Sequence, residues 1–198
     1  MIKDVKIGLA AITLIIFALG STAFATSSLT QTTTINATIS PILSVLTTSG
    51  TVSLSTTPSA AGVQTMASDT VTVSTNDVSG YNLTMSDVDA TTTMVSGANT
   101  IPASSGTPAV PAVQTVNTWG YAVAGGNFSA SGYAAGSSTI SGTLKFAGVP
   151  PLSTPTTLKT TATTATNDTT TVWYSLAVNT SQPTGNYTDS VTYTATCN

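Results

Sequence analysis

Apolar and polar residues alternate in many short stretches of the chain, so that every second side chain is apolar. In residues 81–85, for example, Tyr81, Leu83 and Met85 share one parity and polar residues occupy the other. This period of two is typical of a β-strand with one buried face. The alternation predicts eight strands, at residues 34–39, 51–54, 69–74, 81–85, 119–123, 140–146, 172–178 and 191–195.

Turn-forming residues separate these stretches. Residues 76–80 indicate a hairpin connection, and residues 58–62 and 182–186 each contain Pro and Gly. Short strands joined by polar turns predict an all-β fold of two antiparallel sheets packed as a sandwich, with no helix after residue 25. Residues 41–46 lack clean alternation and are compatible with a buried strand or a single turn.

The first and last strands carry specific expectations. Pro41 and Gly50 allow the chain to turn back, so residues 34–39 are expected to pair beside residues 51–54 within one molecule. The alternative is that this strand is lent to a neighbouring molecule. The last strand is expected to be central to stability, with the ring of Tyr193 buried.

Two stretches are predicted to be exposed loops. Residues 101–116 contain three prolines among small residues, and residues 152–171 are almost entirely Thr, Pro and Ala. The second stretch is also compatible with an edge strand. Neither has the length or charge of an interdomain linker, so residues 26–198 are predicted to form a single domain.

The N-terminus has the pattern of an export signal. Lys3 and Lys6 precede the apolar run 7–20, and residues 23–25 form a small-x-small cleavage site. The run is shorter than the roughly 20 residues of a membrane span. We therefore predict a signal peptide over residues 1–25, cleaved after Ala25, and a secreted or cell-surface location. An uncleaved anchor, the alternative, would be the chain's contact with a membrane.

Charged side chains are scarce, which excludes several classes of function. The chain has four basic residues, seven acidic residues and no His, and residues 26–198 carry only Lys145 and Lys159 as cations. Nucleic acids and anionic membranes need more positive charge than this. Without His or Glu, the chain has no Ser-His-Asp or Cys-His site and no histidine-bound zinc. We expect no enzyme activity and no cofactor.

Three aspartates form a weak candidate for a calcium site. Asp87 and Asp89 are two residues apart, so both carboxylates would face the same way on an extended segment, and Asp77 precedes the same strand. No Asp-x-Asp-x-Asp-Gly pattern is present, and the competing interpretation is that these are turn residues. That interpretation is favoured.

The single cysteine and two aromatic residues have structural interpretations. Cys197 shares the parity of Val191 and Tyr193, and we expect it to point into the core rather than to pair between molecules. Trp119 and Tyr121 share one strand face and are expected to be core anchors, with a sugar-binding platform as the alternative.

Four segments together resemble a known group of proteins. They are residues 69–85, 117–123, 165–171 and 185–195. In this order they are similar to exported immunoglobulin-like surface proteins of bacteria. The ending Gly-x-Tyr-x-Asp-x-Val-x-Tyr also resembles the final strands of fimbrial and spore-coat-U-type subunits and of the WxL cell-wall-binding domain, although the Trp-x-Leu signature is absent. The resemblance implies an immunoglobulin-like sandwich at the cell surface.

These observations favour an exported structural or adhesive β-sandwich protein without catalytic activity. Its expected partner is a component of the cell envelope or of a host surface. One alternative is a pilus-like subunit that self-associates by strand complementation. Another is a glycan- or small-ligand-binding module that uses the loop at residues 101–116.

Overall fold

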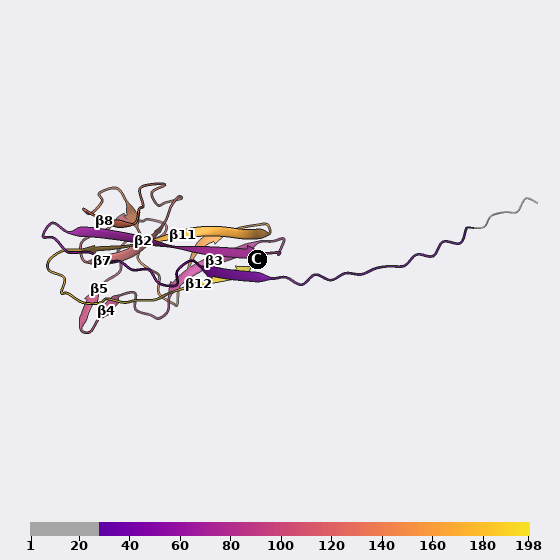
Figure 1. Cartoon of the computed structure of the whole chain (residues 1–198), viewed down its shortest axis with the longest axis horizontal. Helices are drawn as coiled ribbons and strands as arrows, with labels where there is room; N and C mark the ends of the chain where they lie inside the picture. The colour runs from indigo at the N-terminus through magenta and orange to yellow at the C-terminus, as the bar shows by residue number, and fades with distance from the viewer. Residues whose placement is uncertain (1–27) are drawn as a thin grey trace, which may run out of the picture. The chain divides into compact units, whose positions relative to one another are not determined.

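The computed structural model describes residues 28–198 and contains only β-strands (Figure 1). No helix is present in this part of the chain, which agrees with the all-β prediction. The predicted signal peptide, its helix and its cleavage point after Ala25 lie outside the described residues. The chain consists of two units, Met1–Thr38 and Ile39–Asn198, and the second unit contains all the strands described.

Twelve strands make up the described fold. They are β1 (Leu43–Thr47), β2 (Val63–Thr75), β3 (Tyr81–Asp87), β4 (Met94–Ser96), β5 (Asn99–Ile101), β6 (Ala112–Val113), β7 (Thr118–Val123), β8 (Gly136–Ser138), β9 (Lys145–Phe146), β10 (Thr156–Thr160), β11 (Ala165–Val178) and β12 (Val191–Cys197).

The larger sheet is built around β2 and β11. Its strand order is β1-β2-β11-β7, and β8 also pairs with β2. β2 and β11 are antiparallel from Val63 opposite Val178 to Thr75 opposite Ala165, with one irregularity near residues 165–168. β11 also pairs along part of its length with β7. β11 is thus bonded to a strand on each side.

The smaller sheet, β10-β3-β12, packs against the larger one to form the main core. The alternating residues Tyr81, Leu83 and Met85 of β3 are fully buried, as are Val71 and Val73 of β2. In β11 the predicted inward-facing residues are also buried; they are Val172, Tyr174, Leu176 and Val178. The period-two pattern therefore identified the facing surfaces of both sheets, and the fold is β-sandwich-like.

A second, smaller core covers the other face of the larger sheet. It contains the buried residues Met66, Ala122, Leu144 and Phe146, with Phe128, Tyr133 and Trp173 packed against them. Because β11 is covered on both faces, its intervening residues Ser175 and Ala177 are also fully buried. Strict alternation of polar and apolar residues breaks down in this half of β11 for that reason.

A buried polar network fastens two loops to the second face of the sheet. Gln64 Nε2 donates to Gln114 Oε1 (2.9 Å), and Ser175 Oγ donates to the same oxygen (2.6 Å). Gln114 Nε2 donates to the carbonyl of Thr118 (2.8 Å), and the amide of Ser141 donates to Gln64 Oε1 (3.0 Å). Every polar group in the network has a partner, so burying it stabilises the fold rather than penalising it.

A clasp of three side chains joins the two sheets at the other end of the core. Asp168 of β11 accepts hydrogen bonds from Lys159 Nζ of β10 and from the hydroxyl of Tyr81 in β3 (2.8 Å). Burial opposes ionisation of Asp168, but these two donors outweigh it and lower the pKa of its carboxyl group. The clasp is therefore formed with Asp168 ionised.

The predicted first strand is wrong. Residues 28–42 belong to no strand in the structure, and their large apolar side chains are exposed, including Ile35 and Ile39. The edge of β2 is instead occupied by β1, from Leu43 opposite Thr75 to Thr47 opposite Val71. Residues 34–39 do not pair beside residues 51–54 as expected, and β1 takes the place beside β2. Residues 51–58 are not in a named strand either.

The two predicted loops are more ordered than expected. Within residues 101–116, the side chains of Ile101, Ser104 and Gln114 are buried, and residues 112–113 form β6. Residues 152–171 include the whole of β10 and the first half of β11. Thr suits a pleated surface even where little apolar area is buried, so a Thr-rich stretch can pair as a strand.

The last strand lies at the edge of its sheet. β12 pairs with β3 only, and Val191, Tyr193 and Ala195 are half-buried while the residues between them are exposed. Its predicted alternation is correct, but Tyr193 is less buried than expected. Cys197 is exposed, contrary to prediction, because it lies at the end of this edge strand.

The substitution Gln114→Ala tests the buried network. It leaves a donor of Gln64 and the carbonyl of Thr118 without their partner, and each such buried group costs about 1–3 kcal/mol. We expect the free energy of unfolding in urea to fall by about 3 kcal/mol. Gln31→Ala, in the exposed N-terminal stretch, is the control and should change it by less than about 0.5 kcal/mol. A loss below about 1 kcal/mol for Gln114→Ala would contradict the network's role.

Candidate binding cleft

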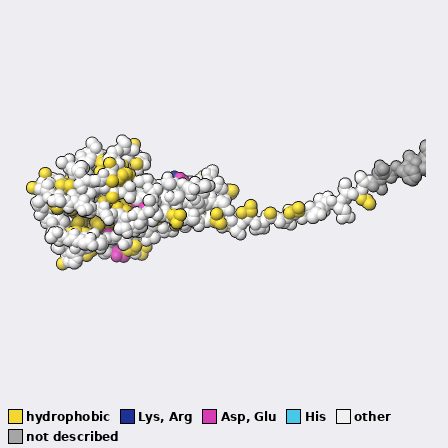
Figure 2. Space-filling view, in the orientation of Figure 1, with side chains coloured by type: hydrophobic (Ala, Val, Ile, Leu, Met, Phe, Trp, Pro, Cys, Tyr) yellow, Lys and Arg dark blue, Asp and Glu magenta, His cyan; other side chains and the backbone are white. Residues whose placement is uncertain are grey.

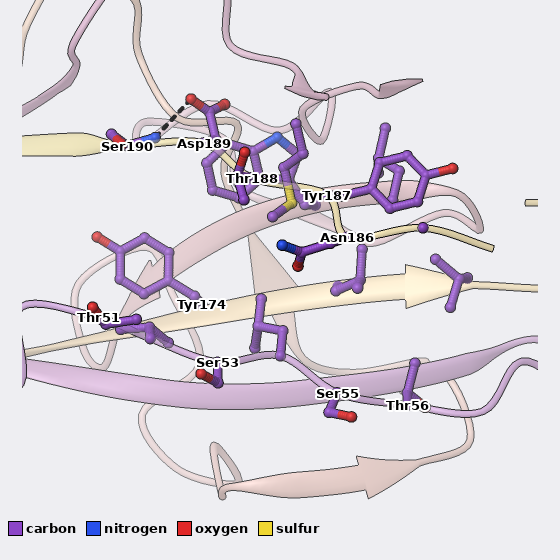
Figure 3. A pocket seen from close by; sticks show the side chains of 18 of the residues that line it. Thr51, Ser53, Ser55, Thr56, Tyr174, Asn186, Tyr187, Thr188, Asp189 and Ser190 are labelled. Carbon is purple, nitrogen blue, oxygen red and sulfur yellow. Dashed lines mark hydrogen bonds between the residues drawn. The ribbon is translucent and has the colours of Figure 1, made fainter. Parts of the chain in front are cut away.

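A cleft of about 960 Å³ opens beside β11, between two non-strand segments of the chain (Figure 3). One wall consists of residues 50–58 and the other of residues 182–190. Figure 3 shows Thr51, Ser53, Ser55 and Thr56 on one side, the run from Asn186 to Ser190 on the other, and the ring of Tyr174 between them.

The first wall is extended but is not part of a sheet ladder. Val52, Leu54 and Thr56 are partly buried, while the residues between them are exposed. The segment is held by side chains: the hydroxyls of Thr65 and Ser137 each donate to the carbonyl of Ser55 at 3.3 Å. Within residues 28–198, no backbone hydrogen bond joins residues 51–58 to a strand. This wall therefore has the alternating burial of a strand but no backbone hydrogen bonds to a neighbouring strand.

The second wall is anchored at its two ends and at one tyrosine. Thr188 exchanges two backbone hydrogen bonds with Val95, at 3.0 and 3.1 Å. The hydroxyl of Tyr187 accepts a bond from Gln182 Nε2 and donates to the carbonyl of Pro183, both at 2.8 Å. These contacts hold the segment in place beside the cleft, so the cleft is built into the fold.

The floor of the cleft is made of core residues. Trp119, Leu176 and Val178 are buried there, and the indole N–H of Trp119 donates to the carbonyl of Thr92 (3.0 Å). The hydroxyls of Tyr174 and Tyr193 share a hydrogen bond of 2.6 Å. Burial raises the pKa of both phenols, that of Tyr193 to about 12, so the floor is uncharged at neutral pH.

Trp119 and Tyr121 are core anchors, as predicted. Tyr121 is fully buried, and Trp119 is 4% exposed at the cleft floor. Neither ring presents a face on which a sugar could stack. The alternative of an aromatic platform on this strand therefore has no support.

Two aspartates meet beside the cleft, and one of them, Asp189, lines it. Asp87, at the end of β3, is fully buried, and it lies opposite Val191, two residues after Asp189. One oxygen of each carboxyl group accepts a backbone bond: Asp89 N–H to Asp87 (3.1 Å) and Ser190 N–H to Asp189 (2.8 Å). The second oxygen of each has no donor among the described residues. The two side chains can hydrogen-bond to each other only when one carries a proton.

The environment of this pair favours the protonated form. Burial is the main cause that raises the pKa of both groups, and the charge of the neighbouring carboxylates adds to it; the pKa of Asp189 rises to about 6. The exposed Asp89 behaves differently. Its carboxylate accepts two bonds from Thr91, at 2.6 and 2.7 Å, and these lower its pKa.

The structure does not bring the predicted calcium ligands together. Asp77 lies in the turn before β3 and Asp87 at the opposite end of that strand, so the strand's length separates them. Asp89 bonds locally to Thr91. Across residues 28–198, no group of three or more acidic, Cys or His side chains is arranged to hold a metal ion. Asp189, which does meet Asp87, was missed because strand register cannot be read from the sequence.

No family model, curated protein or solved structure matches the chain. In the part that the structure describes, no helix is long and apolar enough to span a membrane.

The acidic pair predicts a specific dependence of stability on pH. Because the pKa of Asp189 is higher in the folded than in the unfolded chain, the folded state keeps a proton that the unfolded state releases above about pH 4. This contribution is fully present below pH 4 and is lost as pH rises through about 6. After allowance for solvent screening it amounts to about 1–2 kcal/mol.

Denaturant titrations of wild type and Asp189→Asn between pH 4 and 7 measure this contribution. The Asn amide keeps a donor beside Asp87 without titrating, so stability relative to wild type should rise with pH by about 1–2 kcal/mol. Thr34→Asn, in the exposed stretch of residues 28–42, replaces a side chain that does not titrate and is the control; it should leave the profile unchanged. Parallel profiles for wild type and Asp189→Asn would contradict the shared proton.

Proposed function

We propose that this chain is an exported, non-catalytic β-sandwich protein with a structural or adhesive role at the bacterial cell surface. The observation that carries the proposal is the exposed stretch of residues 28–42, hereafter the arm, which follows the export-signal pattern and precedes the sandwich. Exposed apolar residues that follow one another along a segment, such as Ile35 and Ile39, are typical of a surface that contacts a partner.

The positions of the family-like segments support an immunoglobulin-like arrangement within the sandwich. Residues 69–85 cover the end of β2 and most of β3, residues 117–123 cover β7, and residues 185–195 lead into β12. Residues 165–171 form the first half of β11. The resemblance therefore lies on paired strands of the two main sheets rather than on loops.

The use of the titratable side chains supports a non-catalytic role. Lys159 and Tyr81 both donate to Asp168 between the sheets, and Asp87 lies beside Asp189, with which it can share a proton. Neither group combines a nucleophile with a base, the arrangement that covalent catalysis uses. Both groups act within the fold, where they hold strands together.

Among the alternatives, assembly by strand donation is the one that a specific observation favours. The arm was expected to pair within its own molecule, and it does not do so. The glycan-binding alternative has no such observation, since the loop at residues 101–116 is partly buried and Trp119 lies in the core.

The exposed Cys197 offers a direct test of surface display, because it is the only cysteine. Intact bacteria that express the full chain should react at Cys197 with a membrane-impermeant maleimide. Variants lacking residues 2–25 should react only after lysis, and Cys197→Ser should not react at all. Labelling of the full chain only after lysis would contradict export to the surface. Mass spectrometry of the same samples determines whether the chain begins at Thr26.

A further inference from the structure

The arm has two chemically different faces. Leu29, Ile35, Ala37 and Ile39 share one parity, while the other parity from residue 28 to residue 40 holds only Ser, Thr and Asn. The exposed fractions of Leu29, Ile35 and Ile39 are 94%, 89% and 84%. Apolar side chains can be seen along the exposed arm in Figure 2. This is the pattern of a strand that is half-buried in a sheet, yet in the described chain it has no sheet.

The cleft offers the apolar surface and the unpaired backbone groups that such a strand needs. Its floor is apolar, and its first wall, residues 51–58, has backbone groups without a ladder partner. A buried polar atom at the cleft, Thr56 Oγ1, has no hydrogen-bond partner in the described part of the chain. An inserted backbone offers N–H donors to such an atom, and its apolar face would contact the floor. A volume of about 960 Å³ is sufficient for a short peptide segment.

The charges that line the cleft are also compatible with insertion of the arm. Among the described residues that line the cleft, Asp69 and Asp189 alone have a carboxyl group, and none is a lysine. Residues 28–42 contain no charged side chain. A neutral strand therefore enters without repulsion, whereas an acidic segment would be repelled by the carboxylates.

The connection between the arm and the sandwich favours a second copy as the source of the strand. Asn76 holds the chain at residues 40–42, through bonds to the amide of Ile42 (2.7 Å) and the carbonyl of Ser40 (3.1 Å). From there β1 runs five residues, about 17 Å, before the chain reaches the cleft at Thr47. A molecule's own arm would have to reverse direction at this clamp, beside Pro41, which keeps the preceding residue extended.

We propose that the arm of one copy inserts as an added strand into the cleft of another copy, so that the protein assembles head to tail. The inference rests on the proposed function, since it supplies the partner of the exported domain. A head-to-tail contact of this kind repeats and gives open chains rather than closed pairs. Ile35 and Ile39 would occupy the cleft, and the Ser/Thr face would remain in solvent.

Sedimentation of the mature protein, residues 26–198, tests this assembly. At ~100 μM, a concentration that populates a micromolar association, we expect a series of oligomers. The double variant Ile35→Asp/Ile39→Asp places carboxylates against the apolar floor and should weaken association at least 100-fold. The matched control, Thr34→Asp/Thr38→Asp, carries the same charge on the other face and should still assemble. In dilute solution, where all three proteins are monomeric, they should unfold at the same temperature, because the arm of a monomer lies in no sheet.

Cross-linking locates the contact. In a Cys197→Ser background, a tagged Ala37→Cys protein mixed with an untagged Ser53→Cys protein should form a mixed disulfide under mild oxidation. Ser44→Cys, exposed on β1 away from the cleft, replaces Ser53→Cys in the control and should not. A wild-type protein that stays monomeric, or an Ile35→Asp/Ile39→Asp variant that still assembles, would overturn the inference. If Cys197 is labelled on intact cells but the purified protein is monomeric, the strand exchange is contradicted and the proposed function is not.

Discussion

The pairing of β2 with β11 is the constraint on which the rest of the structure depends. The two strands are bonded from Val63 opposite Val178 to Thr75 opposite Ala165, and the sheet that they form is covered on both faces. One face packs against β10-β3-β12, and the other is covered by the loops that the Gln64–Gln114–Ser175 network fastens. A protein with so few charged residues obtains its stability from this double burial. Its ionisable groups serve as local clasps between strands.

The cleft exists because the chain segments on both sides of it lie outside the strands. β1 covers the edge of β2 only as far as Thr47, and the chain then passes residues 51–58 without a backbone ladder. On the opposite side β12 begins only at Val191, after the segment that carries Asp189. Both segments that flank the cleft thus lie outside the ladders, and core residues such as Leu176 form the floor between them. The arm, with one apolar face and no strand partner, is complementary to that gap.

The alternation of residues revealed which faces are buried but not which strands are partners. It identified the inward residues of β2, β3, β7 and β11 because one face of each packs on the main core. It failed for residues 34–39, which alternate but lie in no strand, as does their expected partner, residues 51–54. For residues 165–171 the sequence predicts a loop or an edge strand, because Thr buries little area, and the structure shows a strand bonded to β2. The pair of Asp87 and Asp189 depends on the register of β3 and β12, which period alone does not contain.

The central claim is that the sandwich folds on its own and that the arm of one molecule inserts into the cleft of another. Amide hydrogen exchange at two protein concentrations tests this claim most directly. The amides of β2 and β11 should exchange slowest at both concentrations, because they open only on global unfolding. Residues 29–39, and with them residues 51–58, should exchange freely in dilute solution and become protected only in concentrated solution. Protection of residues 29–39 that does not depend on concentration would contradict the account, since it would mean that the arm pairs within its own molecule.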